Sequence, residues 1–497
     1  IMIMLFVQYE NSYDKHNENF RDIYRVRTIR SKDGELTMNS VLASPPMGPT
    51  IIHSFPEVKD FVRIYTERDC IFEVQHREFE VEDVAFVDNS ILSIFTIPLI
   101  SGDPSVCLVE PNTAVLSQSL GRKFFGDDNP VGKTIKLNNE FVFQVTGVYK
   151  DLPRTSHFHF DILLSYATPN WLKRWHDNTW NMFFTRTYLL IDQNADIENI
   201  EKRGTELFNK NKPADAAESL WEMQLQPLMD IHLRSALHGE FTQGGNLRMN
   251  RILTIAAFFI LLVAWLNYIN LASAQALDRA REVGIRKVMG LQRILIIRQF
   301  LIESVIINIF SLAVSLLVVL IFKSYFSLVL DVKLSFSYWS TTFIIALIAI
   351  FVFGAVISGL YPAFVMSSFN PLQTLKGKVG TSTGRIGVRK VLLGFQFAIS
   401  ALLIFVTLVI YQQSNLLLKK EIGIDTTNTL VIRGSNLVGS DSVFVSRIEM
   451  FKNALLALPD VKSVTSTNSL PANTAFSDGM FSDIQREEEK TPFTVLY

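Results

Sequence analysis

The stretch from Ile252 to Gly290 constrains this chain most, because an uncharged run continues directly into a charged segment. No Asp, Glu, Lys or Arg occurs between Ile252 and Leu277, and roughly 20 apolar residues suffice to cross a bilayer. Charged residues then follow at helical spacing from Asp278 to Lys287. A membrane anchor alone does not need this second part. We therefore expect the charged segment to contact a partner on the side where it emerges.

Composition indicates a membrane protein with soluble parts. The 497 residues are 48% hydrophobic with a formal net charge of −1, and the apolar residues are clustered in separate runs. Near-neutral charge gives no global signature of nucleic-acid binding. Cys70 and Cys107 are the only cysteines in the sequence, which excludes a zinc site or a disulfide framework built on cysteine. The two could pair in an extracytoplasmic domain or remain buried thiols.

Four charge-free windows are long enough to span a bilayer. They are 252–277 and the segments between Glu303 and Lys323, between Lys333 and Lys376, and between Lys390 and Lys419. No window holds an acidic or basic residue, which argues against a proton- or ion-coupled carrier. The polar side chains of Asn267, Asn270 and Asn308 could form hydrogen bonds between helices.

The apolar run at the start of the chain is too short to span a bilayer. We interpret residues 1–8 as the remnant of a first transmembrane helix and expect both ends of the sequence to be truncated. Lys and Arg are concentrated in 279–298 and 376–390, so the positive-inside rule places these two loops in the cytoplasm. Residues 9–250 and 416–497 then lie outside the cytoplasm.

The region before the spans mixes two kinds of pattern. Strand-like runs occur at 23–29, 61–65, 79–88, 114–117, 141–151 and 186–192, and helical patterns at 89–96, 117–125, 166–176 and 196–211. The predicted fold class is a membrane α-helical bundle plus an α+β extracytoplasmic domain. The predicted domains are 9–250 outside the membrane, 251–390 with three spans, 391–415 as a further span, and 416–497 as a partial second outer domain.

An internal repeat supports this division. Phe55-Pro56-Glu57-Val58-Lys59 resembles Leu458-Pro459-Asp460-Val461-Lys462, and the two lie at nearly equal distances beyond the apolar runs that end at Gln8 and Gln412. We infer that the last span and residues 416–497 begin a second copy of a helix-plus-outer-domain unit. Chance similarity between two surface loops is the alternative.

Two motifs outside the spans favour ordinary structure over chemistry. Gly132-Lys133-Thr134 resembles the end of a phosphate-binding loop, but position 127, where the first glycine belongs, is Asp. We expect a turn into a strand there. His157, His159 and Asp161 alternate, so on a strand they would share one face. A polar strand face is favoured over a metal site, and we predict no bound metal.

The charged segment at 279–290 carries a more specific pattern. Glu282 and Arg286 are i,i+4 partners on a helix, and Arg279 lies three residues before Glu282. Gly284 and Gly290 each cost a helix about 1 kcal/mol relative to Ala, which suggests a bend, a cap or close backbone approach. A basic helix that contacts lipid headgroups is the alternative to a docking segment.

Longer stretches resemble a known family. Residues 279–290 (RAREVGIRKVMG) resemble a motif of FtsX-like ABC transporter permeases, the group that includes the MacB permeases. Residues 359–377 and 388–400 are similar to the family's third-span exit and to the start of the second half in double-length members. Residues 109–165 resemble the MacB-type periplasmic core domain. The chain is identified as a fragment of a double-length member.

The resemblance implies a mechanism in which a separate cytoplasmic ATPase docks on a short coupling helix. It implies no enzyme activity and no cofactor on this chain, with ATP bound by the partner. The family motif carries the ATPase-coupling residues over to Arg279, Arg281, Glu282, Gly284, Ile285, Arg286, Lys287 and Gly290. Glu282, Arg286 and Lys287 would make polar contacts, and Gly284, Ile285 and Gly290 would shape a close-packed face.

The resemblance also implies a place in the cell and a class of function. The chain would be a multi-pass protein of the bacterial inner membrane, with large periplasmic domains that move to export or extract an envelope substrate. A periplasmic adaptor or an outer-membrane component is a further expected partner. The alternative is a non-transport regulator that activates a cell-wall hydrolase. Peptides, macrolides, lipoproteins and other lipids remain open as cargo.

Overall fold

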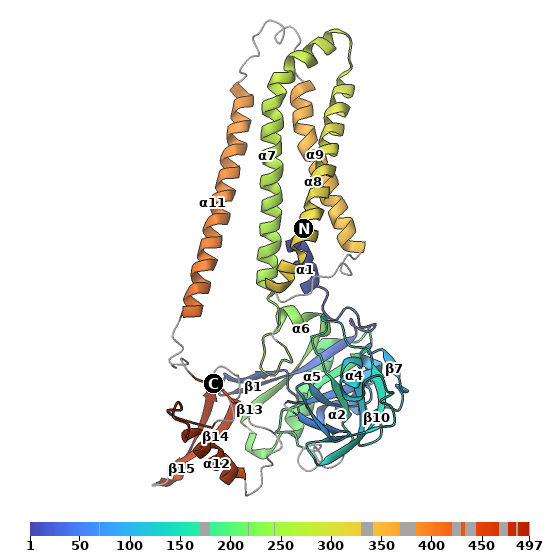
Figure 1. Ribbon diagram of the computed structural model, residues 1–497, viewed down its shortest axis with the longest axis vertical. Coiled ribbons are helices and arrows are strands. Elements are labelled where there is room, and N and C mark those ends of the chain that lie inside the picture. The colour runs from blue at the N-terminus through green and yellow to red at the C-terminus, as the bar shows by residue number, and fades with distance from the viewer. Residues whose placement is uncertain are drawn as a thin grey trace. The chain divides into compact units, whose positions relative to one another are not determined.

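The computed structural model describes residues 1–496 except 69, 169–178, 217, 243, 330–340, 368–382, 420–428, 433–443, 467–475 and 484–485 (Figure 1). At some further positions, among them 276–281, 284 and 287, only the backbone is described. The chain divides into two compact units. We call Ile1–Tyr13 with Gly245–Leu430 the helical unit, and Asp14–Gly244 with Val431–Tyr497 the sheet unit.

The sheet unit is built on one large mixed sheet. Its strands are β1 Ile23–Lys32, β2 Glu35–Ser40, β3 Val58–Glu67, β4 Cys70–Val74, β5 Arg77–Val81, β6 Val84–Val87, β7 Leu99–Ser101, β8 Thr113–Ser117, β9 Thr134–Leu137, β10 Phe141–Tyr149, β11 Ile162–Ser165, β12 Arg186–Ile191 and β13 Ser219–Pro227. The strand order is β13-β1-β12-β3-β6-β11-β8-β10-β9-β4-β5, with β2 paired to β1 and β7 to β10. The pairs β8–β10 and β6–β11 are parallel, and the other pairs are antiparallel.

Short helices connect these strands. They are α2 Met47–Ser54, α3 Ile91–Ile94, α4 Gln118–Phe125, α5 Ile197–Asn211 and α6 Leu228–Arg234. The predicted α+β class is confirmed, and the strand-like runs coincide with strands, although 79–88 splits between β5 and β6 at Glu82 and Asp83. The helical patterns at 89–96, 117–125 and 196–211 correspond to α3, α4 and α5. Most of the helix predicted at 166–176 lies outside the described residues.

Alternating apolar side chains place the core on both faces of the sheet. Trp221 on β13 packs against Phe208 on α5, with ring centroids 5.9 Å apart, and both side chains are fully buried. Cys70 and Cys107 are buried in different hydrophobic clusters. Both are free thiols, so the pairing that the sequence left open is not formed.

The outer edge of β13 is closed by side chains of α5 at i,i+4 spacing. Glu201 accepts a hydrogen bond from Leu225 N at 2.7 Å, and Thr205 accepts one from Met223 N at 3.0 Å. Asn209 donates to the carbonyl oxygen of Trp221 at 2.7 Å. Because the edge groups are bonded, β13 is held rigidly beside β1 and offers little to a foreign strand.

The helical unit contains α1 Met2–Glu10, α7 Leu247–Val288, α8 Arg293–Val329, α9 Thr341–Ser367 and α11 Thr383–Lys419. The described parts of all four predicted spans are therefore helical. Within the described residues, three stretches are long and apolar enough to cross a membrane: Leu247–Ala272, Ile294–Leu328 and Lys390–Leu417. The described apolar part of α9, Phe343–Ile357, is shorter than a span.

Helices α7, α8 and α9 lie together (Figure 1), and small residues let them approach closely. A Cβ added at Gly354 on α9 would lie 2.6 Å from Nε1 of Trp265 on α7. Ser304 on α8 donates to the carbonyl oxygen of Ala355 on α9 at 3.2 Å. These contacts are typical of helix packing in a membrane, where dispersion and hydrogen bonds replace the hydrophobic drive.

The asparagines inside the spans behave differently from one another. Asn270 on α7 contacts Gln396 on α11 at 3.4 Å, which agrees with the predicted bond between helices. Asn308 instead donates to the carbonyl oxygen of Ser304 in its own helix at 2.8 Å, because that oxygen lies one turn away. Asn267 is exposed in the helical unit.

The chain after the last span contains α12 Phe444–Leu456, β14 Phe476–Asp483 and β15 Arg486–Leu496. The two copies of the repeated pentapeptide form the same turn after a helix. Val58 N donates to Phe55 O at 3.1 Å after α2, and Val461 N donates to Leu458 O at 3.1 Å after α12. The shared geometry agrees with the inferred repeat, and a second outer domain stays a prediction.

Candidate functional site

Helix α7 runs without interruption from the start of its apolar stretch to the charged segment. It spans Leu247–Val288, 42 residues, which corresponds to a length of about 63 Å. The charged segment is therefore the end of the spanning helix itself rather than a separate short helix. Gly284 lies inside this helix, so the glycine does not interrupt it.

Gly290 terminates α7 through its backbone conformation. Its φ is +94°, in the left-handed region that favours glycine. Leu291 N donates to Arg286 O at 3.0 Å, the six-to-one bond of a Schellman motif. A Cβ at Gly290 would meet no atom within 4 Å, so backbone conformation rather than close packing explains the glycine in the described structure.

The predicted pair Glu282–Arg286 is formed on the surface of α7. Arg286 Nη2 lies 2.5 Å from Glu282 Oε1, and its Nη1 donates to Gln299 on α8 at 3.2 Å. Both charged side chains are more than a third exposed. An exposed i,i+4 ion pair contributes only about 0.3–0.5 kcal/mol to the stability of a helix, so the pair adds little to the stability of α7. Through Gln299 the pair also contacts the first turns of α8.

Exposed apolar side chains surround this pair. Val288, Met289 and Ile294 are 64%, 74% and 69% exposed, and Ile285 and Leu295 are also exposed. We call these five residues the apolar tip. Val283 and Ile296, by contrast, are buried and fix the tip to the bundle. An exposed apolar cluster rimmed by charge is typical of a protein-binding surface, although Ile294 and Leu295 also begin a candidate membrane span and can face lipid.

The predicted coupling residues are thus distributed along one helix end. Glu282, Ile285 and Arg286 are on the surface, and Gly290 ends the helix. Arg279, Arg281, Gly284 and Lys287 lie on the helical backbone, and their side-chain surroundings are outside the described residues. Of the apolar tip, only Ile285 is among the coupling residues predicted from the sequence. The other four residues of the apolar tip are apolar side chains on either side of Gly290, and this pattern could have identified them.

The other candidate motifs have structural roles. His157 and His159 precede β11 instead of lying on a strand, so the predicted shared face is wrong: His157 is buried and His159 is exposed. Among the described residues, no group of three or more His, Cys, Asp or Glu side chains is placed to hold a metal. The stretch Gly132-Lys133-Thr134 forms the predicted turn, with β9 starting at Thr134.

Apolar helices of spanning length, together with a large mixed sheet unit, indicate a membrane protein with a folded domain outside the bilayer. A family model described as MacB-like periplasmic core domain matches residues 1–207. A second, described as FtsX-like permease C-terminal, matches residues 254–371. The chain belongs to the MacB/FtsX family of ABC transporter permeases.

Relatives of the chain are similar at modest identity. It is 27% identical over 194 residues to an uncharacterized ABC transporter permease, YknZ, of Bacillus subtilis, covering 39% of this chain and 44% of the relative. It is 25% identical over 274 residues to the macrolide export ATP-binding/permease protein MacB of Bdellovibrio bacteriovorus, covering 53% of this chain and 38% of that one. The match therefore spans less than half the length of these relatives.

Solved structures of outer domains also match. One is the periplasmic region of MacB from Actinobacillus actinomycetemcomitans, at 16% identity and a TM-score of 0.30, covering 42% of this chain and 92% of that one. Another is the extracellular domain of the ABC-type transporter YknZ from Gram-positive bacteria, at 15% identity and a TM-score of 0.31, covering 41% and 99%.

Proposed function

We propose that this chain is the permease subunit of an ABC transporter that works by mechanotransmission. ATP hydrolysis by a partner ATPase in the cytoplasm displaces α7, and the displacement moves the periplasmic sheet unit to export or extract an envelope substrate. The partner binds the ATP, and this chain supplies no catalytic residue. The bacterial inner membrane is the expected location, with a periplasmic adaptor or outer-membrane component as a further partner.

The observation that carries the proposal is the continuity of α7. The helix holds the apolar window Leu247–Ala272 and continues to Val288, where Ile285, Val288 and Met289 of the apolar tip are exposed. Its other end leads within the same chain into the sheet unit at Gly244. An α-helix with all its backbone bonds intact transmits axial displacement better than a chain interrupted by loops. An anchor would not need the segment beyond the apolar window.

Reversal of the charged pair tests whether Glu282 and Arg286 bind a partner. The double variant Glu282→Arg with Arg286→Glu keeps an i,i+4 ion pair on α7, whereas Glu282→Ala with Arg286→Ala removes it. We expect both double variants to lose the ATPase that co-purifies with the unmodified chain from host membranes. If reversal retains the ATPase and the alanine variant loses it, the pair only supports the helix.

A matched control exists in the sheet unit. Asp230 and Arg234 form an exposed i,i+4 pair on α6, with nitrogen and oxygen 3.1 Å apart. Its reversal, Asp230→Arg with Arg234→Glu, should leave the co-purified ATPase unchanged. Retention of the ATPase by both variants of the α7 pair would show that the coupling assignment of Glu282 and Arg286 is wrong.

A further inference from the structure

The chain that leads into α7 is a short loop closed at its base. We call residues 235–244 the connector loop, which follows α6 at Arg234. A Cβ at Gly244 would lie 2.6 Å from the carbonyl oxygen of His232 and 2.9 Å from that of Ser235, so the loop returns to its own start. Only Gly245 and Asn246 separate it from α7. Asn246 caps that helix by accepting a hydrogen bond from Arg248 N at 2.9 Å.

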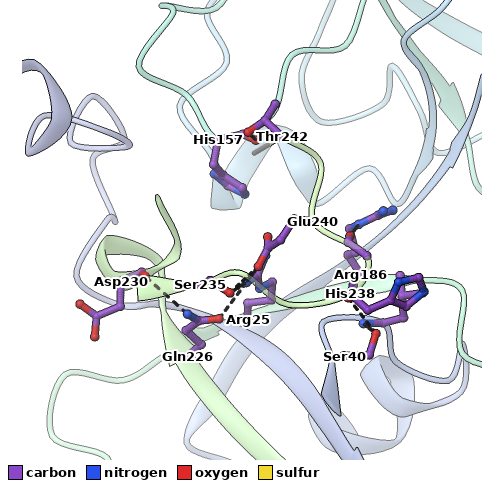
Figure 2. A network of polar contacts seen from close by, with 12 residues as sticks. Arg25, Ser40, His157, Arg186, Gln226, Asp230, Ser235, His238, Glu240 and Thr242 are labelled. Carbon is purple, nitrogen blue, oxygen red and sulfur yellow. Dashed lines mark hydrogen bonds and ion pairs between the residues drawn. The ribbon is translucent and has the colours of Figure 1, made fainter. Parts of the chain in front are cut away.

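The middle of the connector loop is bonded to two parts of the sheet unit (Figure 2). His238 O accepts hydrogen bonds from Val41 N at 3.1 Å and from Ser40 Oγ at 3.0 Å. Gly239 O accepts one from Arg186 Nε on β12 at 2.5 Å. The Arg186 guanidinium also lies 4.1 Å from the ring centroid of Phe241. Burial lowers the pKa of Arg186 to about 10, which leaves it charged at neutral pH.

Glu240 joins the connector loop to β1 through a buried, two-point ion pair (Figure 2). Arg25 Nη1 lies 2.6 Å from Glu240 Oε2, and Arg25 Nη2 lies 2.8 Å from Glu240 Oε1. The Arg25 side chain is 0% exposed and also donates to Gln226 on β13 at 2.7 Å. Burial would lower the pKa of Arg25, but Tyr188 and Glu240 together raise it. Arg25 is therefore held in its charged state.

His157 connects the same loop to the chain that leaves α1. Its Nδ1 and Asp14 Oδ1 lie 2.9 Å apart, and its backbone N donates to that oxygen at 3.1 Å. Its carbonyl oxygen accepts a hydrogen bond from Thr242 Oγ1 at 3.3 Å (Figure 2). Its Nε2 lies 2.7 Å from the hydroxyl of Tyr188 on β12. Because Tyr188 also lies beside Arg25, polar contacts run from Asp14 to Glu240 without a break.

We propose that Glu240, Arg25 and His157 are positioning residues of one rigid junction, which fixes the connector loop and the chain after α1 to strands β1 and β12, so that displacement of α7 reaches the sheet. A flexible linker of ten residues would spread over about 18 Å and absorb such a displacement. A connector loop that is bonded to the sheet would pass the displacement on. The inference rests on the proposed function for the source of the displacement, but the rigidity of the junction stands apart from it.

Hydrogen exchange on the full chain in nanodiscs tests that rigidity without any ATPase. We expect the amides of Val41 and His157, which donate to His238 O and Asp14 Oδ1, to exchange as slowly as those of β12. Thr242→Val should speed their exchange at least about tenfold. The control is Thr37→Val, which removes a similar hydroxyl bond to Arg30 O at 3.0 Å on β2. Exchange of the Val41 and His157 amides at free-loop rates in the unmodified chain would overturn the proposal.

An insertion separates the junction from the proposed function. Adding Gly-Ser-Gly-Ser between Gly244 and Gly245 leaves the apolar tip and the connector loop intact. We expect the insertion variant to retain its ATPase but to lose the ATP-dependent change in exchange of β1 and β12. If ATP still changes the exchange of β1 and β12 in the insertion variant, the proposed role of the junction is wrong. If no ATPase co-purifies with the unmodified chain, the proposed function fails. The exchange rates of the Val41 and His157 amides then still show whether the junction is rigid.

Discussion

Arg25→Met should lower the free energy of unfolding of the sheet unit by about 3–5 kcal/mol, since it leaves Glu240 buried without its partner. Glu240 accepts two hydrogen bonds from the Arg25 guanidinium, which is fully buried. Urea unfolding of the full chain in detergent, followed by the fluorescence of buried Trp221, measures the change. The protein should still fold, because β1 keeps its backbone pairing with β12 and β13.

Two further variants show whether the cost comes from the unpaired charge. Arg25→Met combined with Glu240→Met should recover most of the loss, because apolar replacement of a buried ion pair is often neutral or stabilising. Lys32 and Glu218 form a pair whose side chains are 52% and 79% exposed, so Lys32→Met should cost no more than about 1 kcal/mol. A loss for Arg25→Met no larger than that of Lys32→Met would contradict the account of the junction.

Val288→Glu combined with Met289→Glu should weaken binding of the ATPase by at least about 30-fold. Loss of a central apolar side chain at a protein interface typically weakens the binding free energy by about 2 kcal/mol or more. The two side chains are 64% and 74% exposed, so the exchange should leave the fold of the helical unit intact. Titration of the ATPase onto the nanodisc-embedded chain measures the change. Leu36→Glu, at a 63% exposed position on β2, is the matched control.

This prediction also separates docking from membrane contact. If the apolar tip only contacts lipid, the two glutamates should leave ATPase binding equal to that of Leu36→Glu. Weaker association of the chain with anionic vesicles would then be the main effect. Such a result would favour the alternative reading of the basic segment as a helix that meets headgroups.

Local pattern was sufficient to predict the helices of the spans and about half of the strands in the large sheet. Long uncharged runs predict spans because the bilayer selects them by length, and alternation predicts strands because one face is buried. The continuity of α7 through Gly284 was not predictable, because a glycine costs about 1 kcal/mol that a long packed helix can absorb. The end at Gly290 was within reach, since glycine is the usual residue at a left-handed stop.

The junction had no local signal. Arg25 and Glu240 are far apart in the sequence. The strand pattern around Arg25 predicts that its side chain faces solvent. His157 was grouped with His159 by spacing, but its partners Asp14 and Tyr188 come from distant segments. Only the order of strands in the sheet brings these groups together, and the sequence alone does not determine that order.

A photo-crosslinking residue at Met289 tests most directly that an ATPase works on the end of α7. With benzoylphenylalanine at this exposed position in bacterial membranes, the account predicts a covalent adduct with an ABC-type ATPase after illumination. The adduct should disappear in the Glu282→Arg, Arg286→Glu background. Adducts with lipid alone, in cells where the chain is stably inserted, would contradict the proposed coupling.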